Sequence, residues 1–157
     1  MSDHAGFMRR AIALSREHME ANHGGPFGAV IVMDGKIVGE GWNQVTGAND
    51  PTAHAEVVAI RDACRRLGRF DLRGAVLYTS CEPCPMCLAA TYWARIDRLY
   101  YANTQADAAA IDFDDAFLYR ELALPMEKRS LKCEQILRDE AQQVFQAWTV
   151  KPDKVPY

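Results

Sequence analysis

The chain has 157 residues, 49% of them hydrophobic, and this size allows one compact domain over residues 1–157 with a complete core. A formal net charge of −3 gives no general attraction to nucleic acids or acidic membranes, so a small-molecule substrate is favoured. No apolar run approaches the roughly 18 residues that span a bilayer, and residues 1–4 lack a signal-peptide pattern. We therefore expect a cytoplasmic protein with no membrane partner.

Hydrophobic periodicity predicts alternating helices and strands. In chain order these are a helix (5–21), two strands (27–33 and 36–42), a helix (52–67), a strand (75–79), a helix (83–94), a strand (99–103), a helix (113–122), a strand (131–137) and a last helix (139–149). Asp34-Gly35 is a strong hairpin signal between the first two strands, and a polar loop over 44–51 follows them. Alternation of strands and helices after the hairpin predicts an α/β sheet covered by helices.

Two short segments, Thr52–Glu56 and Cys81–Cys87, carry residues that can bind a metal ion. Cys84 and Cys87 are three residues apart at the start of a predicted helix, so they share a face and can hold one ion. The helix N-terminus favours the thiolate form that zinc requires. His54, in the first turn of another predicted helix, can supply a third ligand. Three protein ligands leave a fourth tetrahedral position open for water, which is the plan of a catalytic zinc site.

Glu56, two residues after the histidine, can serve this site as a base. Two thiolates and a neutral imidazole cancel the charge of zinc, so a nearby carboxylate is needed to take the water proton and pass it on. A structural site with Cys81 as a fourth ligand is the alternative. Glu56 and the joint presence of His-x-Glu and Pro-Cys-x-x-Cys favour catalysis, because this pair of motifs marks zinc-dependent nucleobase deaminases. Cys81 is then expected to be a free thiol near the site.

The segments His54-Ala55-Glu56 and Pro83-Cys84-Pro85-Met86-Cys87 resemble the motifs of the cytidine deaminase superfamily. The resemblance implies a three-layer α/β/α fold whose five-stranded mixed sheet has helices on both faces. It also implies zinc bound by His54, Cys84 and Cys87, with Glu56 as the proton shuttle. Within the superfamily the chain is most similar to bacterial guanine deaminases, which implies hydrolysis of guanine to xanthine and ammonia. A homodimer, with the C-terminal helix 139–151 exchanged between subunits, is a further implication.

The chemistry of guanine calls for a second carboxylate. The C2 atom lies between a bare N3 and a protonated N1, so the site needs one carboxyl to protonate N3 and an acceptor for N1–H and the amino group. Asp115 matches the position that has this role in the resembling enzymes. The pair Asp114-Asp115 can also cap the following helix, and the two roles can fall to one residue each.

Further residues are candidates for binding the base. Asn43, at the end of the second predicted strand, can offer an acceptor and donors to a purine edge, or it can stabilise the turn that follows. The resemblance implies that Phe27 stacks on the base and that Ala55 and Trp93 line the pocket, although both aromatic residues can equally be core. Tyr157 either closes the pocket or frays with the chain end.

Three other functions remain open at this point. A tRNA adenosine deaminase would use the same zinc pocket, with a phosphate track of arginines at 61, 65, 66, 69 and 73, although a solvated helix face explains these residues equally well. Related heterocycles such as isocytosine, aminotriazines and pterins share the N–H and amino edge of guanine. A zinc-stabilised interaction module would keep the ligands without using Glu56.

Overall fold

The structure is a computed structural model that describes residues 3–157. Contacts divide the chain into two compact units, one ending at Ala116 and the other formed by Phe117–Tyr157. The first unit holds α1 (His4–Glu20), β1 (Gly28–Met33), β2 (Lys36–Trp42), α2 (Val45–Ala48), α3 (Ala55–Leu67), β3 (Val76–Cys81), α4 (Pro85–Trp93), β4 (Arg98–Asn103) and α5 (Gln105–Ala109). At its end begins α6 (Ala116–Ala123), and the second unit also contains a short 3₁₀ turn (Met126–Lys128) and α7 (Arg138–Val150).

The strands form one mixed sheet in the order β2-β1-β3-β4. The strand β1 is antiparallel to both of its neighbours, and β3 runs parallel to β4. The sheet therefore has four strands, and the expected fifth strand at 131–137 is wrong. Leu131, Ile136 and Leu137 are all exposed, so the alternation there has no buried face that would specify a strand.

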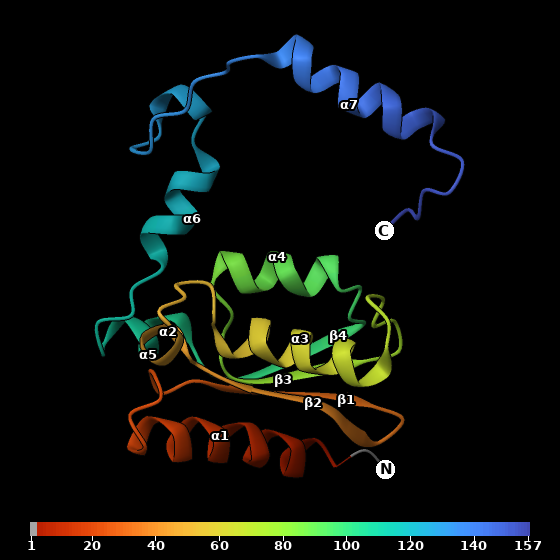
Figure 1. The fold of residues 1–157 in the computed structure, drawn as a ribbon. Coiled ribbons are helices and arrows are strands. Elements are labelled where there is room, and N and C mark those ends of the chain that lie inside the picture. Colours follow the sequence, from red (N-terminus) through yellow and green to blue (C-terminus); the bar gives the residue numbers. More distant parts are fainter. Residues whose placement is uncertain (1–2) are drawn as a thin grey trace. The chain divides into compact units, whose positions relative to one another are not determined.

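Helices cover both faces of the sheet, which confirms the three-layer arrangement. Side chains alternate along β1: Ala29 and Ile31 pack in a cluster with α3, whereas Val30 and Val32 pack in a cluster with α1. Figure 1 shows α1 on one side of the sheet and α3 and α4 on the other. The first unit thus encloses two apolar layers around a central sheet.

Close packing fixes the start of α3 against the edge strand β2. A Cβ atom added to Gly41 would lie 2.2 Å from the carbonyl oxygen of Ala55, and one added to Gly39 would lie 2.6 Å from that of Ala59. Only glycine allows this approach without a shift of the backbone. The first turn of α3, which carries Glu56, is therefore held by the sheet itself.

The helix α4 begins two residues later than its sequence indicated. Cys84 is extended, with φ −67° and ψ 168°, and Pro85 rather than Pro83 occupies the first turn. His54 likewise precedes the first turn of α3 as its N-cap residue. Both short helices α2 and α5 lie in regions where no helix was predicted; α5 begins with a capping box between Thr104 and Asp107.

The second unit is held together locally by polar contacts. The carboxylate of Glu121 accepts hydrogen bonds from the backbone and the hydroxyl of Ser130, at 2.7 and 2.8 Å. The guanidinium of Arg129 donates to the carbonyls of Glu121 and Leu124. No residue of α6 or α7 is buried. Across residues 3–157, no helix has the length and apolar character needed to cross a membrane.

Candidate metal centre and active site

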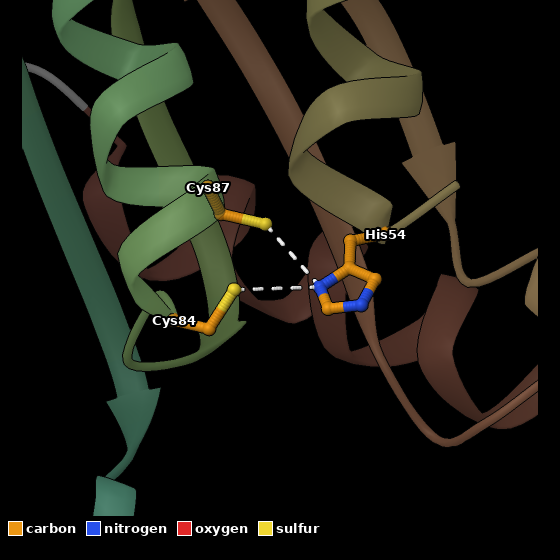
Figure 2. A group of neighbouring side chains, drawn as sticks. All are labelled: His54, Cys84 and Cys87. Carbon is orange, nitrogen blue, oxygen red and sulfur yellow. Dashed lines mark hydrogen bonds between the residues drawn. The ribbon is translucent and has the colours of Figure 1, made fainter. Parts of the chain in front are cut away.

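The three predicted metal ligands come together at the N-termini of two helices. His54 precedes α3 and Cys84 precedes α4, while Cys87 lies in the first turn of α4. The Nδ1 atom of His54 is 3.5 Å from the Sγ atom of Cys84 and 3.4 Å from that of Cys87. Figure 2 shows the three side chains pointing toward one another. The three ligand atoms all lie within 4.8 Å of one another and could hold a metal ion.

The spacing of these donors fits zinc. With Zn–S near 2.3 Å and Zn–N near 2.0–2.1 Å, tetrahedral geometry puts a thiolate sulfur and an imidazole nitrogen about 3.6 Å apart. The two observed distances are within about 0.2 Å of this value. Thiolate and imidazole ligands also favour the binding of zinc over that of magnesium or calcium.

Cys81 lies outside the ligand group of the described residues. Its thiol donates instead to the carbonyl oxygen of Thr104, at 3.7 Å. Burial raises the pKa of Cys81 to about 11, and the nearby charges of Glu56 and Asp115 add to the effect. Because Cys81 lies outside the group formed by His54, Cys84 and Cys87, the ligand set has three protein members, which favours an open catalytic site over a closed structural one.

Hydrogen bonds and nearby charges favour the thiolate form of Cys84 in the metal-free protein. A hydrogen bond from Cys87 lowers the pKa of Cys84 to about 4, and hydrogen bonding to His54 acts in the same direction. Because Cys87 is the donor in this pair, its own pKa is raised. The thiolate of Cys84 in turn raises the pKa of His54. Binding of a divalent ion would displace the remaining protons from the ligands.

Glu56 is buried in the first turn of α3, with 6% of its surface exposed. Burial raises the pKa of its carboxyl above the ordinary value. The hydroxyl of Thr79 donates a hydrogen bond to Oε1 of Glu56, at 3.1 Å. A buried carboxyl with a raised pKa beside a candidate metal site is typical of a group that accepts and returns a proton.

The two neighbouring aspartates have different environments. The Asp114 carboxylate accepts a hydrogen bond from the backbone N–H of Ala116, the first residue of α6, at 2.8 Å. The Oδ1 atom of Asp115 is buried and has no hydrogen-bond partner among residues 3–157. Asp114 therefore caps the start of α6. The buried Oδ1 atom of Asp115 is a hydrogen-bond acceptor with no partner among the described residues. An unpaired buried oxygen is costly unless another molecule satisfies it.

Asn43 is buried, and its side chain organises the backbone around it. Its Oδ1 accepts hydrogen bonds from the backbone N–H groups of Gly25 and Val45, both at 3.2 Å. The contact with Val45 confirms that Asn43 stabilises the turn that follows it. Because these two bonds use Oδ1, the Nδ2 group is the part of the amide that suits a ligand.

The other candidate binding residues differ in how far they are buried. Phe27 is partly buried against the core under α3, and its ring meets Phe113 edge-on with the ring centres 4.9 Å apart. Trp93 is 70% exposed, so it is not a core residue. The side chain of Ala55 is fully buried in the core. Tyr157 is exposed and belongs to the second unit.

Sequence reasoning missed two residues, Phe113 and Thr79. Phe113 follows Asp112, whose φ of +69° gives the chain a sharp local turn, and no periodicity marks it as a partner of Phe27. Thr79 contacts Glu56 across 23 residues of sequence. The packing of α3 on the face of the sheet brings the two together, so only the three-dimensional fold could reveal the contact.

A sandwich of this kind, with one histidine, two cysteines and a buried glutamate at two helix N-termini, is the arrangement of zinc-dependent nucleobase deaminases. These enzymes hydrolyse an exocyclic C–N bond. The chain belongs to the cytidine and deoxycytidylate deaminase family, whose zinc-binding region matches residues 1–103.

Similar proteins extend this match beyond the zinc-binding region. Guanine deaminase from Bacillus subtilis (strain 168) is 52% identical over 155 residues, which covers 99% of each chain, and its crystal structure matches with a TM-score of 0.96. A tRNA-specific adenosine deaminase from Agrobacterium fabrum is 42% identical over 71% of this chain and 73% of its own. A guanine deaminase structure from Nitrosomonas europaea is 31% identical, covers 74% of this chain and 67% of its own, and has a TM-score of 0.68.

Proposed function

We propose that this protein hydrolyses guanine to xanthine and ammonia with the help of zinc. The observation that carries the proposal is the buried, unused Oδ1 of Asp115. In guanine the protonated N1 and the 2-amino group point two donors in nearly the same direction, and an acceptor-only carboxylate can receive both. Adenine and cytosine present a bare nitrogen beside the amino group, so they offer Asp115 a poorer match. The 52% identity to a guanine deaminase over nearly the full chain supports the same substrate.

The bound ion would be held by His54, Cys84 and Cys87. When bound, zinc would lower the pKa of a water molecule in its open fourth position and so supply a nucleophile at neutral pH. Glu56 takes a proton from the attacking water and delivers it to N3 of the base. Glu56 then takes the second proton from the new hydroxyl on C2 and gives it to the amino group, and the C2–N bond breaks with release of ammonia. The oxygen of the water stays on C2, and the product is xanthine.

The remaining residues would orient the base. Phe27 and Phe113 would provide an aromatic wall for the purine ring, and Trp93 would line the same pocket from α4. The Nδ2 group of Asn43 would donate to an acceptor on the purine edge. Because the side chain of Ala55 is enclosed in the core, this residue would contribute through its backbone.

Deamination of adenosine in tRNA is less well supported. Four of the five arginines considered for a phosphate track form ion pairs with aspartates: Arg61 with Asp50, Arg65 and Arg66 with Asp62, and Arg73 with Asp71. Carboxylates at these positions offset the positive charge that would attract a phosphate backbone. Among free bases, aminotriazines, isocytosine and pterins remain alternative substrates, because they can offer the same pair of donors.

Glu56→Gln tests the proposed chemistry. The variant keeps the size of the side chain but cannot carry a proton between water and base, so kcat for xanthine formation should fall by about 10²- to 10⁴-fold. Its zinc content and melting temperature should stay near the wild-type values. A variant that retains zinc, fold and full activity would remove Glu56 from the mechanism.

We also propose that residues 1–157 form a single domain and that the protein is a homodimer. In this dimer the C-terminal helix, residues 139–151, would be exchanged between the two subunits. The support is the composition of α7, which exposes Val144, Phe145 and Trp148 at positions that share one helix face. Exposed apolar faces of this kind are typical of protein interfaces.

A further inference from the structure

Thr79 is a buried polar residue on the side of the sheet that faces the candidate active site. It lies in β3 two residues after Leu77, which belongs to the core under α3, so both side chains point to that face. Only 1% of the surface of Thr79 is exposed. A hydroxyl so completely buried must find its partners within the protein.

The partners of this hydroxyl are unusual for a strand residue. Its Oγ1 lies 3.1 Å from Oε1 of Glu56 and 3.1 Å from the carbonyl oxygen of Cys81. A hydroxyl has one proton to donate, so these two oxygens share a single donor. The contact therefore joins the carboxyl of Glu56 to the backbone of β3 at the strand end that leads into α4.

The effect on Glu56 is geometric. A glutamate side chain has three rotatable bonds, and burial alone does not select one orientation of its carboxyl group. The carboxyl of Glu56 also has hydrogen bonds with its own backbone and with the thiol of Cys87. The bond from Thr79 is the one that ties its Oε1 atom to β3. Resting on the function proposed for Glu56, we infer that Thr79 is a positioning residue that holds Glu56 with Oε2 directed to the attacking water and the base.

Two substitutions separate the hydroxyl from the volume of the side chain. Thr79→Val keeps the shape but removes the donor, so kcat for guanine should fall about 10- to 100-fold through loss of alignment, whereas KM should change little. Thr79→Ser keeps the hydroxyl and should restore most of kcat. Thr91→Val is the matched control, because Thr91 is also buried but its hydroxyl donates to the carbonyl of Cys87 in its own helix. That type of bond adds little stability to a helix.

The experiment combines steady-state kinetics with zinc analysis, melting temperature and a crystal structure of Thr79→Val. The inference predicts reduced kcat, normal zinc content, normal affinity for xanthine and a reoriented Glu56 carboxyl, with Thr79→Ser and Thr91→Val close to wild type. Wild-type kcat in Thr79→Val, or equal losses in Thr79→Val and Thr79→Ser, would overturn it. Wild-type enzyme that releases no ammonia from guanine, or full activity in Glu56→Gln, would instead contradict the proposed function itself.

Discussion

The two compact units of the chain use their apolar residues in opposite ways. In the first unit, the faces of the sheet and the helices α1 and α3 enclose two apolar clusters. In the second unit, α6 and α7 have no buried residue, and large side chains such as Phe117, Leu122, Phe145 and Trp148 are exposed. The first unit can therefore hold a preorganised site within its own core. The second unit would need contact with another surface to bury its apolar residues.

Loss of a metal ligand should have the largest effect. Cys87→Ala removes one of three ligands, so zinc content should fall steeply and deamination should become undetectable. Unfolding temperature should also fall, since bound metal stabilises the fold that binds it. Cys133→Ala is the control, because this exposed cysteine of the second unit lies outside the ligand group. Metal analysis and guanine turnover are the measurements, and full zinc content in Cys87→Ala would contradict the assignment.

Replacement of the unpaired carboxylate should have the next largest effect. Asp115→Asn preserves size but removes the charge and one acceptor, so kcat/KM for guanine should fall about 10- to 100-fold, as for loss of a hydrogen bond to a charged group. Zinc content should not change. Asp114→Asn is the matched control: asparagine still offers an acceptor to the N–H of Ala116, so both turnover and stability should stay near the wild-type values. Equal activity of Asp115→Asn and wild type would exclude Asp115 from substrate recognition.

A change on α7 tests the second unit. If the exposed face of α7 lies in a dimer interface, Trp148→Ser should raise the dissociation constant of the dimer about 30-fold or more, as expected for a buried tryptophan anchor. Gln146→Ser, on the opposite side of the same helix, should leave it unchanged. Sedimentation over a range of concentrations measures both. A wild-type protein that is monomeric at every concentration would rule out the proposed dimer.

Loss of a surface ion pair in the first unit should have the smallest effect, and this effect is on the free energy of unfolding. Arg10 forms a two-point contact with Glu40, at 2.7 and 3.1 Å, and this hydrogen bonding lowers the pKa of Glu40 from its ordinary value. A lowered pKa in the folded state means that the stabilisation is present above the unfolded pKa and disappears as the pH falls through the folded value. Because both side chains are partly exposed, Glu40→Gln should cost only about 0.5 kcal/mol at pH 7, and this cost should shrink as the pH falls through the folded pKa of Glu40.

Urea unfolding of wild type and Glu40→Gln over a series of pH values from 7 downward measures this difference. Glu17→Gln is the control, since Glu17 is more exposed and lies 3.6 Å from Arg10. A cost that grows as the pH falls would show that the sign is wrong. A cost of several kcal/mol would show that charge pairing, rather than burial, dominates the stability of the first unit.

Local sequence was enough to predict which residues form the candidate metal site, but not their surroundings. Cys84 and Cys87 are three residues apart, so their spacing brings this pair together. His54 reaches the pair because α3 and α4 are in contact. The contact of Thr79 with Glu56 depends on how α3 packs on the sheet, which no local pattern encodes. The same reason explains the failed strand at 131–137. An alternating pattern specifies a strand only where a sheet edge and a buried face are available to it.

The most direct test of the central claim is ammonia release from a panel of substrates by the zinc-loaded protein. The panel contains guanine, adenine, cytosine, isocytosine, a pterin, an aminotriazine and tRNA. We expect guanine to give xanthine with a kcat/KM well above that of every other substrate, and we expect this preference to weaken in Asp115→Asn. Conversion of adenosine to inosine in tRNA, with no ammonia from guanine, would contradict it.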